Sequence, residues 1–343
     1  MTTNKTKINE LRDFNAIAFH LGLESYGPKA IQLPTYQDIG NAIFTRPDNT
    51  QNGILDTHGS IANRLETMTW DDTIDKPIAC LQKMPFVTVN TKSNKLLTTS
   101  LHEPHRLNSP YIFKSEFPDH ETFEKTFGKR LKATDGDRVK MAKLFAEVDP
   151  MSLIHGTFMS YSKEFEVRGG GAKITAALSG FAEATNIQAV EYGTQKSDRI
   201  NAKQEEKKTS KEGFGTFQTS ATLWSPESID AYFHLDIDLL RSYQLGENFV
   251  GWAIAISLLK ILRFIDRGLR LRSHCILQPK LTESGEIDLA FRLPLKARGN
   301  YFELGFPDEK ALATIVTDLT ERLVESTTFG EAIVLADAVT NKK

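Results

Sequence analysis

The sequence predicts an α+β fold built around a mostly antiparallel sheet. Residues 269–277 begin with strict alternation of apolar and polar side chains, which is typical of a half-buried strand. Residues 248–266 are strongly apolar and are followed by Gly268, which predicts a buried helix with a glycine at its carboxyl end. Strands and helices are intermixed without the regular alternation of a doubly wound fold, so an antiparallel sheet is favoured.

The remaining elements follow from the same two periodicities and from their end signals. Asp56 or Thr57 can cap a helix through Glu66, and Asp149-Pro150 ends a helical stretch that breaks near Asp135. Further strands are expected at 14–24, 77–90, 152–160, 187–192, 215–224, 231–240 and 286–293, and further helices at 121–147, 172–185 and 308–326. Residues 27–56 hold several prolines and glycines and are expected to form an irregular insertion.

Composition is that of an ordinary globular protein. The 343 residues are 40% hydrophobic and 25% charged, and we expect a single elaborated domain over 1–343. The apolar run within 249–262 is too short to span a bilayer, so no membrane contact is expected. Two distant cysteines indicate a reducing compartment, and the polar N-terminus lacks the apolar core of a signal peptide. These features predict a cytoplasmic location.

The net charge of −2 argues mildly against nucleic-acid binding, which usually leaves a basic footprint. A global sum hides local fields, however. Five basic residues stand between Lys260 and Arg272 against the single acid Asp266. Charge therefore permits an RNA groove without demonstrating one.

Enzyme motifs are missing from the sequence. It contains no phosphate-binding P-loop, no dinucleotide-binding glycine pattern, no zinc-protease pair of histidines and no nucleophile elbow. His102-Glu103-Pro104-His105 comes nearest to a ligand cluster, but the proline prevents helical spacing and no third ligand is evident. We therefore expect no enzyme activity, no cofactor and no bound metal.

Several segments could contact RNA or could be ordinary surface. Gly169, Gly170 and Gly171 precede the expected helix at 172–185, so their N–H groups could approach a phosphate between Arg168 and Lys173, or they could form a flexible turn. The alternating face of Arg270, Arg272 and His274 could be a basic stripe on an open sheet. The charged segment 194–212 could be a solvated loop or an insertion that closes over a strand.

The order of the short blocks is more specific than any one of them. In sequence order they are Ser60-Ile-Ala-Asn-Arg-Leu-Glu66, His105-Arg106, Asp149-Pro-Met-Ser-Leu-Ile-His-Gly156, Arg168 with Lys173, Tyr192-Gly193 through Arg199, Ala231 to Arg241, and Gly268-Leu-Arg-Leu-Arg272. Together they resemble the backbone subunit of the type I-G (formerly I-U) CRISPR surveillance complex Cascade. This is the Cas-seven-type member of the RAMP superfamily, and the resemblance covers residues from about 20 to about 280.

The resemblance implies a modified RNA-recognition-type (ferredoxin-like) palm with long finger and thumb insertions. It implies a subunit of a ribonucleoprotein for antiviral defence, bound to CRISPR guide RNA and to other Cascade subunits. Copies would form a head-to-tail helical filament that presents the guide for pairing with target DNA, and the guide rather than the protein would read sequence. Residues 194–212 become the candidate thumb.

RNA-binding residues are assigned from the matched blocks. Arg64 is expected to contact phosphate with Ser60 and Asn63, and the three glycines depart from the proline-bearing spacing that the family has at that point. The full expected set is Ser60, Asn63, Arg64, His105, Arg106, Arg168, Gly169, Gly170, Gly171, Lys173, Lys196, Arg199 and Lys203. Asp236 and Asp238 lie in a matched block and are interpreted as structural.

Two other functions remain open. Related RAMP backbones cut target RNA with a loop aspartate, and Asp56, Asp149 and Asp198 are the loop acids that such a ribonuclease would use here. A generic single-strand-binding protein would need stacking aromatics along a basic groove. Phe14, Phe158, Phe165, Tyr192 and Phe217 stand mostly at positions expected in the core.

Overall fold

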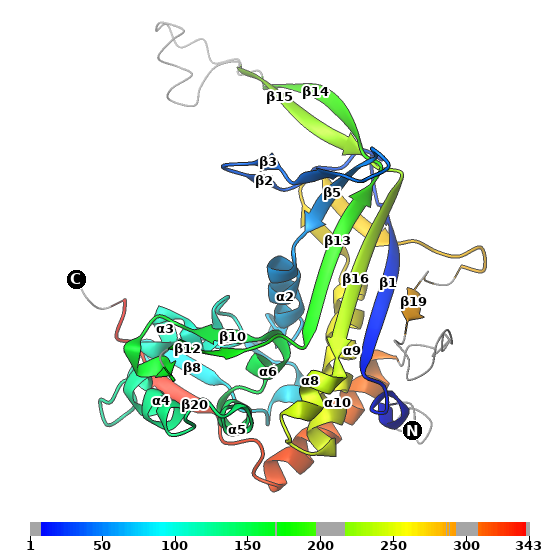
Figure 1. Ribbon diagram of the computed structural model, residues 1–343. Helices are drawn as coiled ribbons and strands as arrows, with labels where there is room; N and C mark the ends of the chain where they lie inside the picture. The colour runs from blue at the N-terminus through cyan, green and yellow to red at the C-terminus, as the bar shows by residue number, and fades with distance from the viewer. Residues whose placement is uncertain are drawn as a thin grey trace, which may run out of the picture.

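The centre of the molecule is an antiparallel sheet with ferredoxin-like connections (Figure 1). Its four principal strands are β1 (Ala16–Ser25), β13 (Leu178–Thr185), β16 (Ser228–Asp236) and β18 (Cys275–Pro279), which lie in the order β18-β1-β16-β13. Helix α2 (His58–Thr67) follows β1, and α9 (Glu247–Asp266) follows β16. Numbered along the chain, the strand order is 4-1-3-2, the arrangement of a β-α-β-β-α-β unit. The predicted fold class is confirmed.

The computed structural model describes residues 8–168, 170–196, 217–285, 287, 289–292 and 308–340. The central sheet is widened by β17 (Leu269–Arg272) at one edge and by β5 (Gln51–Asp56) and β4 (Ile43–Thr45) at the other, and β19 (Leu289–Arg292) pairs with β1. We use "palm" for this sheet together with α2, α9 and α10 (Glu309–Glu325).

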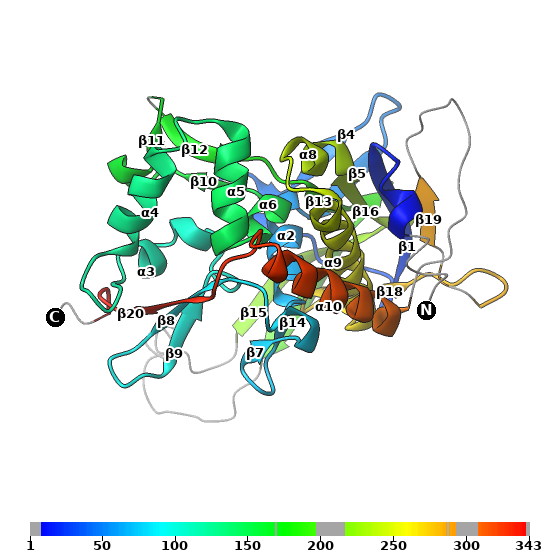
Figure 2. The ribbon, with the colours of Figure 1, turned by 90° about the horizontal axis from the view of Figure 1, so that it is seen from below.

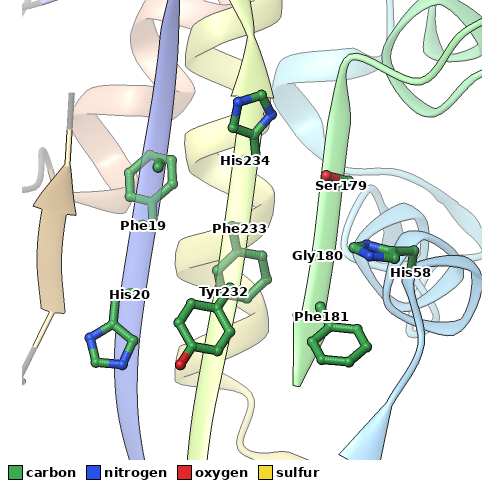
Figure 3. A pocket seen from close by; sticks show the side chains of 10 residues that line it. Phe19, His20, His58, Ser179, Gly180, Phe181, Tyr232, Phe233 and His234 are labelled. Carbon is green, nitrogen blue, oxygen red and sulfur yellow. The ribbon is translucent and has the colours of Figure 1, made fainter. Parts of the chain in front are cut away.

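Within the part of the chain that the structure describes, one face of the palm sheet is packed against helices and the other is not. Along β16, Ile229, Ala231, Phe233 and Leu235 are buried, whereas the residues between them are partly or fully exposed. Phe233 meets Phe264 of α9 edge to face, with 6.3 Å between ring centroids. The helices lie behind the strands, and the alternate side chains point to the opposite face (Figure 3). We call this second surface the open face.

Helix α9 is the core helix that the apolar run predicts. It is long and apolar enough to span a membrane by composition, but its side chains are mostly buried inside the protein. Gly268 follows it with φ of 80°, a left-handed conformation suited to glycine at a helix end. Trp252 of α9 donates its indole N–H to Thr320 of α10 at 3.0 Å. The expected helices at 248–266 and 308–326 are confirmed.

A second group of elements, which we call the lateral lobe, lies beside the palm (Figure 2). It comprises residues 79–168 and 170–174 together with β20 (Ile333–Ala336), which pairs in parallel with β8 (Val87–Asn90). Packed rings form its interior, among them Phe123, Phe127, Phe145 and Phe165. Its elements are β8, β9 (Leu96–Thr99), η1 (Ala79–Leu81), η2 (Arg106–Asn108), α3 (Pro110–Phe113), α4 (Phe123–Lys132), α5 (Arg138–Val148), α6 (Met151–His155), β10 (Thr157–Met159), η3 (Lys163–Phe165), β11 (Glu166–Val167), β12 (Gly170–Ile174) and β20.

A two-stranded arm projects from the other end of the palm (Figure 1). It consists of β14 (Gln188–Lys196) and β15 (Phe217–Ser225), paired from Gln188↔Ser225 to Lys196↔Phe217. Trp224 at its base exchanges backbone hydrogen bonds of 2.8 Å with Ile31. The smaller pairs are β2 (Thr35–Tyr36) with β3 (Gly40–Asn41), and β6 (Trp70–Asp71) with β7 (Lys76–Pro77); α8 (Ile237–Ser242) follows β16.

Several predicted elements were wrong. Residues 172–185 form the end of β12, the whole of β13 and the connection between them instead of a helix, because the small apolar and polar side chains of β13 alternate with a period of two. Residues 152–160 form α6 and β10 instead of one strand. Residues 231–240 divide into β16 and α8, because the Asp236 carboxylate accepts a hydrogen bond from the Leu239 N–H and so caps the helix. The insertion expected over 27–56 ends in β5, which belongs to the palm sheet.

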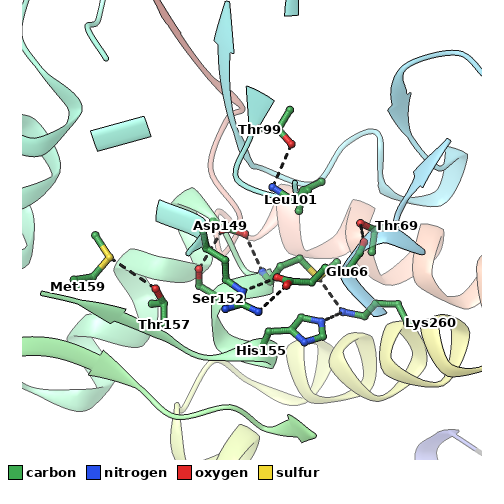
Figure 4. A network of polar contacts seen from close by, with 12 residues as sticks. Glu66, Thr69, Thr99, Leu101, Asp149, Ser152, His155, Thr157, Met159 and Lys260 are labelled. Atoms are coloured by element: carbon green, nitrogen blue, oxygen red, sulfur yellow. Dashed lines mark hydrogen bonds and ion pairs between the residues drawn. The ribbon is translucent and has the colours of Figure 1, made fainter. Parts of the chain in front are cut away.

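A buried cluster of charged side chains joins the palm to the lateral lobe (Figure 4). Arg106 of η2 donates to both carboxylate oxygens of Glu66 of α2, at 2.5 and 2.6 Å. Lys260 of α9 lies 2.7 Å from His155 Nε2 of α6. Asp149 accepts hydrogen bonds from the Met151 N–H and the Ser152 hydroxyl at the start of α6. We call Glu66, Arg106, Asp149, His155 and Lys260 the charge cluster.

Burial controls the protonation of the charge cluster. It raises the pKa of Glu66 to about 7, against the opposing effect of Arg106, and lowers the pKa of Lys260 to about 7. Burial also holds the pKa of His155 well below its usual value, and Lys260 and Arg106 add to that effect. His155 therefore stays neutral and accepts through Nε2 from Lys260.

The first prediction concerns the close approach of α2 to β13. A Cβ on Gly180 would lie 2.4 Å from Cγ2 of Ile61, so Gly180→Ala forces the helix and strand apart. We expect it to lower the free energy of unfolding by about 1–3 kcal/mol in chemical denaturation, the usual cost of overpacking. Gly59→Ala in the same helix meets nothing within 4 Å and is the control, with equal or higher stability expected. Equal stability of wild type and Gly180→Ala would contradict this packing.

The second prediction uses the titration of Lys260. Its pKa is about 7 in the folded protein and near 10.5 when exposed, so between these values the unfolded chain binds one proton more than the folded one. Stability should therefore rise from pH 7 to 8.5 by up to about 1.4 kcal/mol per pH unit. Lys260→Met should abolish this rise in denaturant titrations, and the exposed control Lys83→Met should keep it. The account fails if Lys260→Met retains the wild-type slope.

Candidate nucleic-acid interface

A row of aromatic side chains crosses the open face of the palm (Figure 3). His20 on β1 is paired in register with Tyr232 on β16, and Tyr232 is paired with Phe181 on β13. Because residues in register point to the same side of a sheet, their rings follow one another across three strands. His58, at the start of α2, lies beside Phe181 at the edge of the sheet, with 5.2 Å between ring centroids. We call these four residues the ring row.

The rings of the row remain accessible to solvent. Tyr232 is 38% exposed, and the His20 side chain is 31% exposed. The His20 and Tyr232 rings are stacked, with centroids 5.1 Å apart and an interplanar angle of 28°. A groove of about 430 Å³ runs over them and also touches Ala18, Ser179 and His234. The row therefore forms the floor of a shallow aromatic groove.

Asp230 fixes the orientation of the His20 ring. Nε2 of His20 lies 2.7 Å from Oδ1 of Asp230, and Oδ2 of Asp230 accepts a 2.8 Å hydrogen bond from the Ser228 hydroxyl. The Asp230 side chain is only 15% exposed. This partly buried contact holds the imidazole in its stacked position on Tyr232 without a ligand.

The residues predicted on α2 differ in their exposure and in their contacts. Asn63 is exposed and Ser60 is half-buried. Arg64, the predicted phosphate contact, forms a 2.7 Å ion pair with Asp56 and donates to the carbonyl oxygen of Leu271 at 3.0 Å. Its guanidinium therefore ties α2 to β5 and β17 inside the palm.

His105 and Arg106 have opposite environments. His105 is exposed, as an RNA contact requires. Arg106 is buried and directs its guanidinium to Glu66 in the charge cluster, so the structure gives it a structural role in place of the predicted contact with RNA.

The glycine segment does not form the predicted anion site. Gly170 and Gly171 lie in β12, and no helix begins after them, so no helix N-terminus faces an anion there. Gly171 packs closely against β10, where a Cβ added to Gly171 would lie 2.7 Å from the carbonyl oxygen of Met159.

The two basic residues that flank the glycines are both exposed. Arg168 forms a 3.1 Å ion pair with Asp135, and Lys173 lies on β12. Gly169 lies outside the described residues.

The predicted thumb falls at the tip of the arm. Lys196 is the last residue of β14, whereas Arg199 and Lys203 lie outside the described residues, as does 197–212 of the predicted thumb. For the face of Arg270, Arg272 and His274, the sequence left a basic stripe and an ordinary exposed sheet face open, and in the structure these residues divide between β17 and a turn. Arg272 donates to the carbonyl oxygens of Gln32 and Leu55 at 2.9 and 2.6 Å and is thus engaged inside the protein.

The ring row was missed by sequence reasoning. Its members are far apart along the chain, and only strand register brings them together. A signal was present: His20, Tyr232 and His234 stand at the alternate, non-core positions of their strands, where charged residues are usual. Of the aromatics expected in the core, Phe165 is buried, but Phe158 is 54% exposed.

Comparisons with known proteins give one family. A family model described as CRISPR-associated protein GSU0053 matches residues 24–189, just under half of the chain, from the end of β1 to the start of β14. This segment contains α2, the whole lateral lobe apart from β20, and four of the blocks that carry the sequence resemblance. The comparison with curated proteins gave no match.

Two solved structures also align with the chain. A CRISPR RNA-guided surveillance complex in a pre-nicking state matches with 10% identity and a TM-score of 0.42, over 91% of this chain and 88% of that one. Csc2 of Thermofilum pendens matches with 9% identity and a TM-score of 0.28, over 90% and 75%. At these scores the two alignments add nothing to the fold derived above. Residues 24–189 of the chain are thus similar to the family of CRISPR-associated protein GSU0053.

Proposed function

We propose that the protein is a non-catalytic backbone subunit that binds CRISPR guide RNA in a Cascade-type complex in the cytoplasm. The observation that carries the proposal is the match to a CRISPR-associated family. The ferredoxin-like palm supports it, because an antiparallel sheet with one open face is a common platform for single-stranded RNA. Sequence specificity would come from guide pairing with target DNA, so the protein needs only to hold the RNA.

The arm supports assembly of several copies along one guide. It extends from the palm at the end away from the lateral lobe (Figure 1), so it can reach a neighbouring subunit. A contact between unlike surfaces of identical subunits generates an open helical array when the rotation does not close. We propose that the arm makes this head-to-tail contact and acts as the thumb.

A ribonuclease is the second candidate, and two of its three acids are poorly placed. Asp149 is fully buried in the charge cluster, and Asp56 is 4% exposed and paired with Arg64. Metal-assisted cleavage needs an accessible acid beside the scissile phosphate. Asp198 lies outside the described residues. Incubation of the purified complex with target RNA and Mg²⁺ or Mn²⁺ distinguishes the two functions, and we expect no cleavage.

The third prediction tests RNA identity. When the chain is co-expressed with a CRISPR array and the neighbouring subunits, we expect discrete repeat–spacer RNAs to co-purify with an excess of this chain over each RNA. Sequencing of the bound nucleic acid and measurement of the protein-to-RNA ratio provide the test. A preparation that holds random RNA, or one copy per RNA, would overturn the guide-backbone proposal and leave a generic single-strand-binding protein.

The fourth prediction tests the arm. Joining Val190 to Leu223, which are paired in register, through an Asn-Gly turn removes the outer arm and keeps its base at Trp224. We expect an unchanged unfolding midpoint but loss of multi-copy assembly on the guide, measured by sedimentation of the co-expressed complex. Lys83→Ala, which removes only an exposed ion pair with Glu321 of α10, is the control. Full assembly of the shortened protein would show that the arm is not the thumb.

A further inference from the structure

We propose that the ring row stacks on unpaired bases of single-stranded RNA that crosses the open face of the palm. This inference rests on the proposed function. It adds which surface of the protein binds the RNA, which chemical group of the RNA is recognised, and on which side of the ring row the RNA backbone passes. Tyr232 and Phe181 provide the stacking faces. His20 supports Tyr232 from one side, and His58 extends the row beyond Phe181.

The shape of the site suits flat aromatic groups. The ring row is continuous across three adjacent strands (Figure 3), and its rings are partly exposed. Its groove of about 430 Å³ is within the ~300–1,000 Å³ typical of sites for small organic groups. Base–aromatic stacking tolerates any sequence because every base has a π-face, as a guide-holding subunit requires.

The chemistry of the lining favours bases over charged groups. Among the described residues that line the groove, none carries a carboxylate, an ammonium or a guanidinium group. His58, His234 and Ser179 instead offer imidazole and hydroxyl groups that can form hydrogen bonds around the rings. Such a lining recognises a polar heterocycle and gives no strong contact to a phosphate or a charged peptide.

The charges on either side of the row orient the RNA backbone. On the arm side, the next row in register holds Asp230 and Glu183, which repel phosphate. On the lobe side, the next row holds Ala18, His234 and Ser179, without a carboxylate. β13 begins there, directly after β12 with its exposed Lys173. The phosphates therefore pass on the lobe side, and the bases point along the open face over Tyr232 and Phe181.

The fifth prediction separates base stacking from phosphate binding. The full-length protein is titrated with a single-stranded 12-nucleotide RNA and with an abasic strand of equal length, which has the same phosphates and no bases. For Tyr232→Leu combined with Phe181→Leu we expect affinity for the RNA to fall about tenfold to several hundredfold, since each stacked base contributes substantially. Affinity for the abasic strand should not change. Leucine keeps apolar bulk at both positions and removes only the aromatic faces.

Controls keep this test independent of folding and of the proposed function. Tyr26→Leu replaces a 73% exposed aromatic residue outside the row and should leave both affinities unchanged. In the wild-type protein, RNA containing 4-thiouridine should crosslink to ring-row peptides, a measurement that needs no variant. The inference is wrong if the leucine variant binds the RNA and the abasic strand like wild type and no crosslink forms on the ring row. The guide-backbone function still stands in that case if the assembled complex carries guide RNA. If the variant instead loses self-association with unchanged RNA binding, the row is a subunit contact and the inference is equally overturned.

Discussion

The arrangement of this protein depends on the ion pair between Glu66 and Arg106 and on the buried groups around it. Glu66 and Lys260 come from the two palm helices, whereas Arg106, Asp149 and His155 come from the lateral lobe. Breaking one partner of a buried pair costs roughly 3–5 kcal/mol, because the remaining charge stays in a medium of low polarity. The cluster therefore fixes the lobe against the palm and, with it, the position of Lys173 relative to the open face.

The charge cluster also explains why the sequence resemblance was easier to recognise than the RNA-binding residues. The Ser60–Glu66, His105–Arg106 and Asp149–Gly156 blocks, which helped to identify the family, all contribute a member to the cluster. Their residues are arranged in the structure for packing and charge pairing. Arg106 was assigned to RNA because its partner is 40 positions away in the sequence, and no local pattern connects the two residues.

Local sequence patterns predicted the elements whose periodicity was unambiguous. The apolar helix α9, the capped helix α2 and the broken pair α4 and α5 followed from spacing, caps and glycine signals. Residues 172–185 were predicted wrongly because small alanine-rich segments fit either period, and the close packing of Gly180 against Ile61 is visible only in three dimensions. The ring row depends on the register of β1 with β16 and of β16 with β13, and no local pattern contains the pairing of such distant segments.

Together, these features describe a protein in which structural and RNA-binding roles are separated. Basic residues such as Arg64 and Arg272 stabilise the palm, and the open face presents rings with few charges. The most direct measurement of this account is a cryo-electron microscopy structure of the assembled complex with its guide RNA. The account predicts guide density across the open face, with bases over Tyr232 and Phe181 and phosphates on the side of the lateral lobe. A guide that follows another surface, or an open face covered by a neighbouring protein chain, would contradict it.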